Sequence, residues 1–145
     1  NLFLVEGTGE TWPNVFAVWS YIENGWDWSD QMGADLFAKG HAHHAEAHPT
    51  LTALKADPFI LLGCLELIWS THGWAGMKIF LSQAAIDHFS GKTAGSDAER
   101  LAYWVEKMSA AYQLDFAPLV SHWGFPVSTE TFEKTAGYEK SSLSP

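Results

Sequence analysis

The 145-residue chain has a length typical of one domain and sufficient to bury a hydrophobic core. Apolar residues make up 47% of it, with eight Trp, nine Phe and four Tyr, which excludes a disordered acidic tail despite the formal net charge of -9. The acidic balance argues against nucleic acid as a partner, because nucleic acid binds basic patches. We expect no membrane span, since no apolar run approaches the roughly 20 residues required.

Helical patterns fill most of the first half of the chain. Pro13 suits the first turn of a helix, where its missing N–H is harmless. Apolar residues then follow at helical spacing, namely Val15, Phe16, Trp19 and Ile22. Asn24-Gly25 is expected to end this helix. The Ala-rich stretch from Ser29 to Ala47 is predicted to be helical as well, and Pro49 closes it.

The next predicted helix is apolar on almost every side. Asp57 is its expected cap and Pro58 its first residue. A helix that is apolar all round belongs at the centre of its domain. Glu66 is the exception, and it needs either a partner or a way out to water. Gly73 is expected to separate this helix from another that runs from residue 74 to 89.

Capping signals define the remaining helices. Ser96 and Glu99 have the spacing of a capping box. Asp115 is expected to cap a short helix through Trp123, and Ser128 a last helix. The only strand pattern covers residues 2–5. The fold class is therefore mainly α, with residues 1–145 forming one helical domain or subdomain of short packed helices.

One carboxylate near the start of the chain is the first candidate for a functional site. Glu10 follows the small-residue turn Gly7–Gly9 and precedes an aromatic-rich helix. On local sequence alone, such a residue is a solvated side chain favoured by the helix dipole. The glycines also let the backbone approach another group closely, so a ligand role stays open at this point.

A histidine-rich segment is the second candidate. His44 and His48 are four residues apart and His41 lies one turn before His44, so on a continuous helix they share a face. Imidazoles at this spacing can bind zinc, nickel or copper. The zincin signature H-E-x-x-H is absent, because the carboxylate of Glu46 comes two residues after His44. A weak metal site and a solvated, His-rich surface helix both remain open.

The other polar and aromatic residues give weaker signals. The scattered histidines are expected to form local hydrogen bonds, and they are His72, His88 and His122. Cys64 lies in an apolar run and is expected to be a buried, inert thiol. Trp26 and Trp28 lie in a polar stretch, so they are the Trp pair most expected to be exposed and to contact a glycan or peptide.

Several segments follow one another in an order typical of one protein family. They are Gly9–Phe16, Ile68–Phe80 with its Gly-Trp break, Asp97–Ser109, and Asp115–Val127. In this order and spacing the chain resembles the enhancin-type zinc metallopeptidases, a gluzincin family that includes mucin-degrading bacterial enzymes. His72 departs from the family pattern, which has Phe before Gly-Trp.

The resemblance implies a role for Glu10 as the third protein ligand of a zinc ion. In a gluzincin, two His and a Glu hold zinc, and the Glu of H-E-x-x-H takes a proton from the bound water. That signature is absent here, so the resemblance implies that a segment upstream of Asn1 carries it. The chain is then the C-terminal helical part of a secreted peptidase that acts on mucin-like glycoproteins, and it is not active alone.

Three origins fit this picture: a cleaved fragment paired with its N-terminal half, a fragment on its own, or a relative that has lost catalysis. A different class of function also remains open. The alternative is a non-catalytic helical module that binds a glycan or a protein through exposed aromatic residues.

Overall fold

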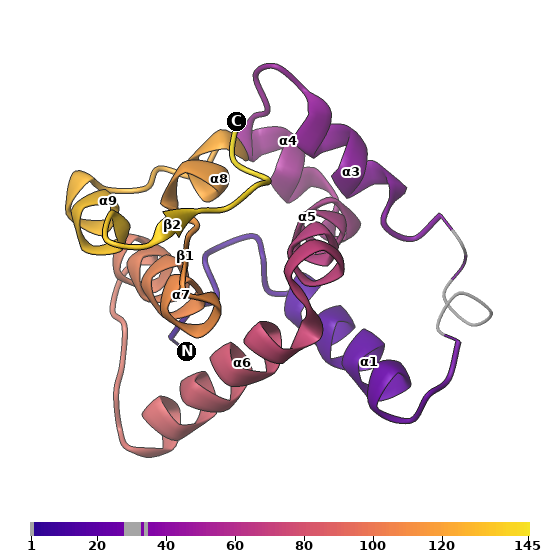
Figure 1. Ribbon diagram of the computed structural model, residues 1–145, viewed down its shortest axis with the longest axis horizontal. Coiled ribbons are helices and arrows are strands. Elements are labelled where there is room, and N and C mark those ends of the chain that lie inside the picture. Colours follow the sequence, from indigo (N-terminus) through magenta and orange to yellow (C-terminus); the bar gives the residue numbers. More distant parts are fainter. Residues whose placement is uncertain (1, 28–32, 34) are drawn as a thin grey trace.

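The computed structural model describes residues 2–27, 33 and 35–145, and the fold is mainly α (Figure 1). The helices are α1 (Thr11–Glu23), α3 (Ala38–Ala45), α4 (Leu51–Ala56), α5 (Pro58–His72), α6 (Trp74–Phe89), α7 (Asp97–Tyr112), α8 (Ala117–His122) and α9 (Thr129–Thr135). Two short strands, β1 (Leu114–Asp115) and β2 (Glu139–Lys140), pair in parallel. The predicted fold class is confirmed.

Local capping sets the ends of the long helices as the sequence predicts. At the start of α5, Asp57 Oδ1 accepts a hydrogen bond from the Phe59 N–H at 2.9 Å, and Pro58 is the first helical residue. Gly73 has φ 93°, a left-handed conformation that suits glycine, and it separates α5 from α6. Both predicted boundaries are confirmed.

Two of the three capping signals of the C-terminal half are confirmed. Ser96 and Glu99 form a reciprocal capping box at the start of α7. Asp115 is not the N-cap of α8, which is Phe116, but Asp115 Oδ1 accepts a hydrogen bond from the Ala117 N–H at 3.0 Å. The Ser128 hydroxyl accepts from the Thr131 N–H at the start of α9.

Two expectations about secondary structure are wrong, and one helix was missed. Residues 2–5 form no strand, and the strands that exist join segments 25 positions apart, Leu114 with Glu139 and Asp115 with Lys140. The helix predicted over residues 29–47 is shorter in the part that the structure describes, because α3 starts at Ala38 and ends at Ala45. Helix α4, capped by the Thr50 side chain, was not expected.

Helix α5 is the centre of the core. It lies in the middle of the view in Figure 1 and packs against α1, α3, α4 and α6. Its fully buried residues include Leu62, Cys64, Leu65 and Ile68. Glu66 has the partner that its burial requires, since its Oε2 lies 2.6 Å from His41 Nε2. Burial raises the pKa of the Cys64 thiol, so the expectation of an inert cysteine is confirmed for its position.

Helix α3 approaches α5 very closely, through two glycines. A methyl group on Gly40 would meet the backbone of Gly63, Ile60 and Cys64, and one on Gly63 would meet the backbone of Phe37 and Gly40. Glycine is therefore required on both sides of the crossing. The crossing fixes the histidine-rich helix against the core. None of the helices that the structure describes is long and apolar enough to span a bilayer.

Candidate functional site

Glu10 lies directly before α1, at the end of a hydrogen-bonded turn. The Thr8 hydroxyl donates to the Val5 carbonyl at 2.7 Å, and the Thr11 N–H donates to the Thr8 carbonyl at 3.0 Å. The Asn14 amide donates to the Glu10 carbonyl at 2.8 Å. These bonds fix the backbone at Glu10, whereas its exposed carboxylate makes no capping hydrogen bond to α1. The carboxylate is thus free to bind a group that comes from outside this part of the chain.

The structure gives Glu10 no companion ligands from the part of the chain that it describes. Within residues 2–27, 33 and 35–145, no three His, Cys, Asp or Glu side chains come together in a way that could hold a metal ion. A useful zinc site needs three protein ligands. The described residues alone therefore do not form such a site around Glu10.

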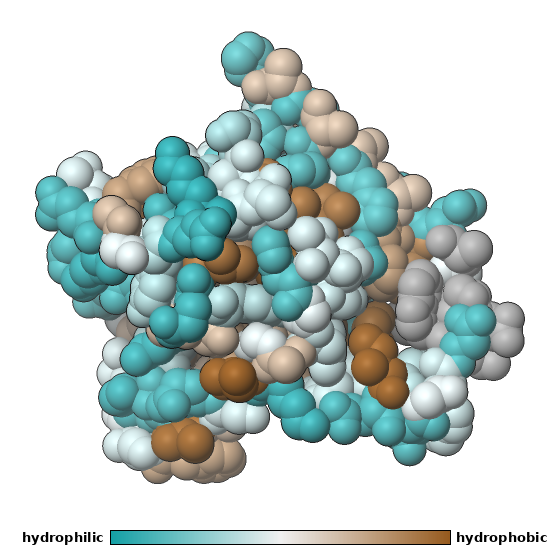
Figure 2. Space-filling view, in the orientation of Figure 1, coloured by the Kyte–Doolittle hydropathy of each residue, from teal (hydrophilic) through white to brown (hydrophobic). Residues whose placement is uncertain are grey.

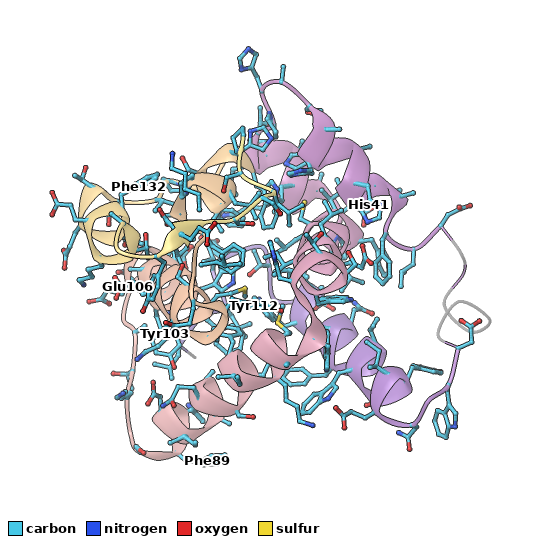
Figure 3. All side chains as sticks on the ribbon, in the orientation of Figure 1. His41, Phe89, Tyr103, Glu106, Tyr112 and Phe132 are labelled. Carbon is cyan, nitrogen blue, oxygen red and sulfur yellow. The ribbon has the colours of Figure 1, made fainter. Side chains whose placement is uncertain are left out.

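The histidines 41, 44 and 48 do not share a helical face. Helix α3 ends at Ala45, because Glu46 has an extended backbone with ψ 145°, so His48 lies beyond the helix and is exposed. His41, labelled in Figure 3, pairs with Glu66 on α5, whereas His44 packs against α8. The expectation of a common face is wrong because the helix stops one turn too early.

The same helix forms a polar contact with α8 that the sequence did not reveal. His44 Nδ1 accepts a hydrogen bond from the Trp123 indole N–H at 3.1 Å, and His43 Nε2 lies 3.2 Å from the Trp123 carbonyl. His122 Nε2 donates to the His44 carbonyl at 2.8 Å. Burial, followed by the nearby His122, His41 and His43, lowers the pKa of His44. These imidazoles join α3 to α8.

His72, the last residue of α5, packs among aromatic rings. Its ring lies edge-on to Phe116 at 6.0 Å and to Tyr112 at 6.3 Å, and its Nε2 lies 2.8 Å from the Ser141 hydroxyl. Burial lowers the pKa of His72. The imidazole thus ties the C-terminal segment to α5.

Asp87 is a buried carboxylate with a full set of partners. Its oxygens accept hydrogen bonds from Gln83 at 2.9 Å, Lys92 at 2.7 Å and Tyr103 at 2.8 Å, and Lys107 lies 4.0 Å away. These bonds, that of Lys92 first, lower the pKa of Asp87 to about 2. A carboxylate held ionised in this way serves to join α6 to α7. Of these contacts, the sequence indicates only the one between Gln83 and Asp87, which are four residues apart on one helix.

Of the predicted aromatic pair, Trp26 is exposed, with 61% of its surface accessible. Its ring packs edge-on against Tyr21 at 5.9 Å, just after the end of α1. Trp28 lies outside the described residues. The prediction that Trp26 is exposed is therefore confirmed.

Two hollows in the surface differ in character. One of about 470 Å³ lies between α7 and α9, where Lys134 pairs with Glu106 and Glu130. The other, of about 360 Å³, is apolar and lies between α1, the second half of α6 and Phe3. Hydrophobic residues are visible on the surface over α6 (Figure 2), and Phe89 at the end of that helix is 86% exposed (Figure 3).

Comparisons with family models, with curated proteins and with solved structures find no match for this chain. A function must therefore be inferred from the order of the sequence motifs and from the geometry around Glu10.

Proposed function

We propose that this chain is the C-terminal helical part of a zinc metallopeptidase of the enhancin type, and that Glu10 is its third zinc ligand. The observation that carries the proposal is the free carboxylate of Glu10 on a fixed backbone at the start of α1. The resemblance to the family assigns the ligand role to this residue. The two His ligands and the general base belong to a segment upstream of Asn1.

The residues around Glu10 support this role in two ways. The Asn14 amide and the turn of Thr8 hold the Glu10 backbone, so a bound ion would not have to order it. The carboxylate is exposed and makes no capping bond, so binding a cation breaks no internal contact. An oxygen ligand of this kind is one that zinc accepts.

In such an enzyme, each part of the chain has a defined task. Glu10 supplies a carboxylate oxygen as a ligand, and the exposed Trp26 offers a ring face to a sugar or a peptide of a glycoprotein substrate. Zinc, when bound, lowers the pKa of a bound water and polarises the peptide carbonyl. The chain alone supplies neither the other ligands nor the base, so we expect no peptidase activity from it without the upstream segment.

Metal analysis of the natural polypeptide that includes the upstream segment tests the proposal. We expect stoichiometric zinc in the unmodified protein and at least about a tenfold loss of zinc affinity in Glu10→Ala. Glu6→Ala is the matched control, because Glu6 is also an exposed carboxylate of the same turn and should leave the affinity unchanged. Zinc retention that is unaffected by Glu10→Ala would refute the ligand role.

The exposed Trp26 also favours a second candidate function, a non-catalytic module that binds a glycan or a protein. A saturable change in Trp fluorescence when the isolated chain is titrated with mucin-type glycans, in the presence of a chelator, would support this function. The change should be lost in Trp26→Ala. Absence of binding by the isolated chain, together with Glu10-dependent zinc in the longer polypeptide, would leave the peptidase proposal alone.

A further inference from the structure

Helix α6 presents a row of apolar and small side chains to solvent, and hydrophobic residues are visible over this helix in Figure 2. Ile79, Ile86 and Phe89 are 56%, 58% and 86% exposed, respectively. With the exposed small residues Ala75 and Ser82, they follow a four-three-four-three spacing. We call these five residues the α6 stripe. A helix packs side chains at this spacing along a second helix, so the α6 stripe indicates a missing helical neighbour.

The α6 stripe carries no free charge, although the chain has a formal net charge of -9. Helix α6, whose residues are all described, contains two charged residues besides His, namely Lys78 and Asp87. Asp87 is buried and bonded to Lys92 and Tyr103. Lys78 Nζ lies 3.0 Å from Glu23 Oε1 on α1. Two copies of an acidic chain repel each other, so they meet at least electrostatic cost through a face of this kind.

The order of small and large side chains in the α6 stripe fits its own reversed copy. Along α6 the stripe reads Ala75, Ile79, Ser82 and Ile86, so small and large residues alternate. In an antiparallel pair of α6 helices about a two-fold axis, Ala75 faces Ile86 of the second copy. Ile79 likewise faces Ser82. A large side chain then meets a small one at every layer, whereas a parallel pair would place each isoleucine against its own equivalent.

The size of this face is that of a weak dimer interface. Phe89 lies at each end of the antiparallel contact. Helix α1 widens the contact, because Phe16, 42% exposed, and Trp19 line a hollow beside Ala85 and Phe89. With side chains of this size, the contact covers on the order of 600 Å² on each copy, against about 800 Å² for a standard interface. We therefore expect a dissociation constant on the order of tens of micromolar.

We propose that two copies of this chain associate through the α6 stripe, with the two α6 helices antiparallel about a two-fold axis between Ile79 and Ser82. The same face of each copy makes the contact, so the assembly closes at two copies. The inference goes beyond the proposed function and does not depend on it, because the interface involves neither Glu10 nor a metal ion. It assigns an occupant, a second copy of the chain, to the exposed apolar side of α6.

Sedimentation velocity tests the inference. We expect the 145-residue protein to change from a monomer of 16.1 kDa to a dimer as its concentration rises from about 1 to 300 µM. Ile86→Asp places a carboxylate in the apolar contact and should weaken dimerisation at least about tenfold. Thr129→Asp is the matched control, because it adds the same charge at an exposed position on α9. Both variants should keep the circular dichroism and the melting temperature of the diluted protein.

Cross-linking with a short bis-maleimide tests the antiparallel arrangement. The native Cys64 is 0% exposed, so an introduced cysteine is the one that reacts. In the proposed pair, Ser82 lies about 4–5 Å along the helix axis from its own equivalent, whereas the exposed His88 lies about 22 Å from its equivalent. Ser82→Cys should therefore give cross-linked dimers, and His88→Cys should not.

A monomer at every concentration would overturn the inference and would leave the α6 stripe to a different partner. A dimer that Ile86→Asp weakens no more than Thr129→Asp would overturn it as well, because the contact would then lie elsewhere. Equal cross-linking of Ser82→Cys and His88→Cys would refute the antiparallel arrangement.

Discussion

The hydrogen bond between Trp123 and His44 requires a neutral imidazole. The indole N–H can only donate, so His44 Nδ1 must carry a lone pair and cannot carry a proton. The groups that face His44 are other imidazoles, those of His41, His43 and His122, and a second positive charge among them would be repelled. Protonation of His44 therefore weakens the contact between α3 and α8 in two ways. It removes the acceptor of the Trp123 hydrogen bond, and it places a positive charge beside other imidazoles.

We predict that the protein loses stability as the pH falls below about 6.5 because of this contact. The pKa of His44 is lower in the folded state than its ordinary value of 6.5. The unfolded chain therefore takes up the proton first, and the stabilisation present above pH 6.5 is lost as the pH falls through the folded pKa. One proton gives a slope of at most about 1.4 kcal/mol per pH unit, and the half-buried position reduces it.

Urea unfolding at pH 7.5, 6.5 and 5.5 measures this effect. His44→Gln keeps an acceptor for the Trp123 indole but does not titrate, so it should flatten the pH dependence. His48→Gln, at an exposed position, should retain it. His72, whose pKa burial also lowers, contributes in the same range and leaves a residual slope in both variants. The same pH dependence in His44→Gln as in the unmodified protein would contradict the prediction.

Sequence reasoning at the residue scale succeeded where one side chain and its immediate surroundings decide the outcome. Cys64 and Glu66 both lie in an apolar run, so burial of the thiol and a partner for the carboxylate followed directly. The contact of His44 with Trp123 joins residues 79 positions apart, and no local pattern encodes it. The exposure of Glu10 could be expected from the sequence. The sequence could not show that no other potential metal ligands gather around it among the described residues.

At the scale of elements, helix ends were predictable and helix crossings were not. Caps such as Asp57 and Ser96 act within three residues, and they are visible in the sequence. The close crossing of α3 and α5 depends on Gly40 meeting Gly63, two residues that the sequence presents only as interruptions of helices. The parallel pair of two-residue strands escaped prediction because each strand is too short to show a period.

We predict that Gly40→Ala and Gly63→Ala each destabilise the fold by about 1–3 kcal/mol or more. In a helix without a close neighbour, replacing glycine by alanine stabilises the protein by roughly 0.5–1 kcal/mol. A loss of stability in these variants would therefore come from the close helix crossing. The added methyl group meets backbone atoms on the facing helix, and these cannot move aside as a flexible side chain would. Urea unfolding measures the loss.

Gly137→Ala is the control for these variants. Gly137 lies in a turn, and an added methyl group there meets no atom of the described residues within 4 Å. The free energy of unfolding of the Gly137→Ala variant should stay within about 0.5 kcal/mol of that of the unmodified protein. If either crossing variant were as stable as the control, the close contact between α3 and α5 would be refuted.

At the scale of the whole molecule, one apolar cluster connects the two ends of the chain. It includes Val5 near the start, Ile68 on the central helix and Phe125 near the end. Two long-range bonds close the arrangement, one from the Glu6 N–H to Asp97 and one between His72 and Ser141. The mainly α class was predictable from helical spacing, but the packing of α1, α3, α4 and α6 on α5 depends on shape complementarity that a single sequence does not display.

We predict that this shared core makes residues 1–145 unfold in one cooperative transition. Near-UV circular dichroism reports the packed Trp rings, far-UV circular dichroism reports the helices, and their midpoints should coincide. Ile68→Val removes one methyl group at a position with 0% exposure and should lower stability by about 0.5–1.5 kcal/mol in both signals alike. Ile79→Val, the same change on a helix at 56% exposure, should have almost no effect. Separate midpoints, or a shift caused by Ile68→Val in only one signal, would show that the chain divides into units that unfold independently.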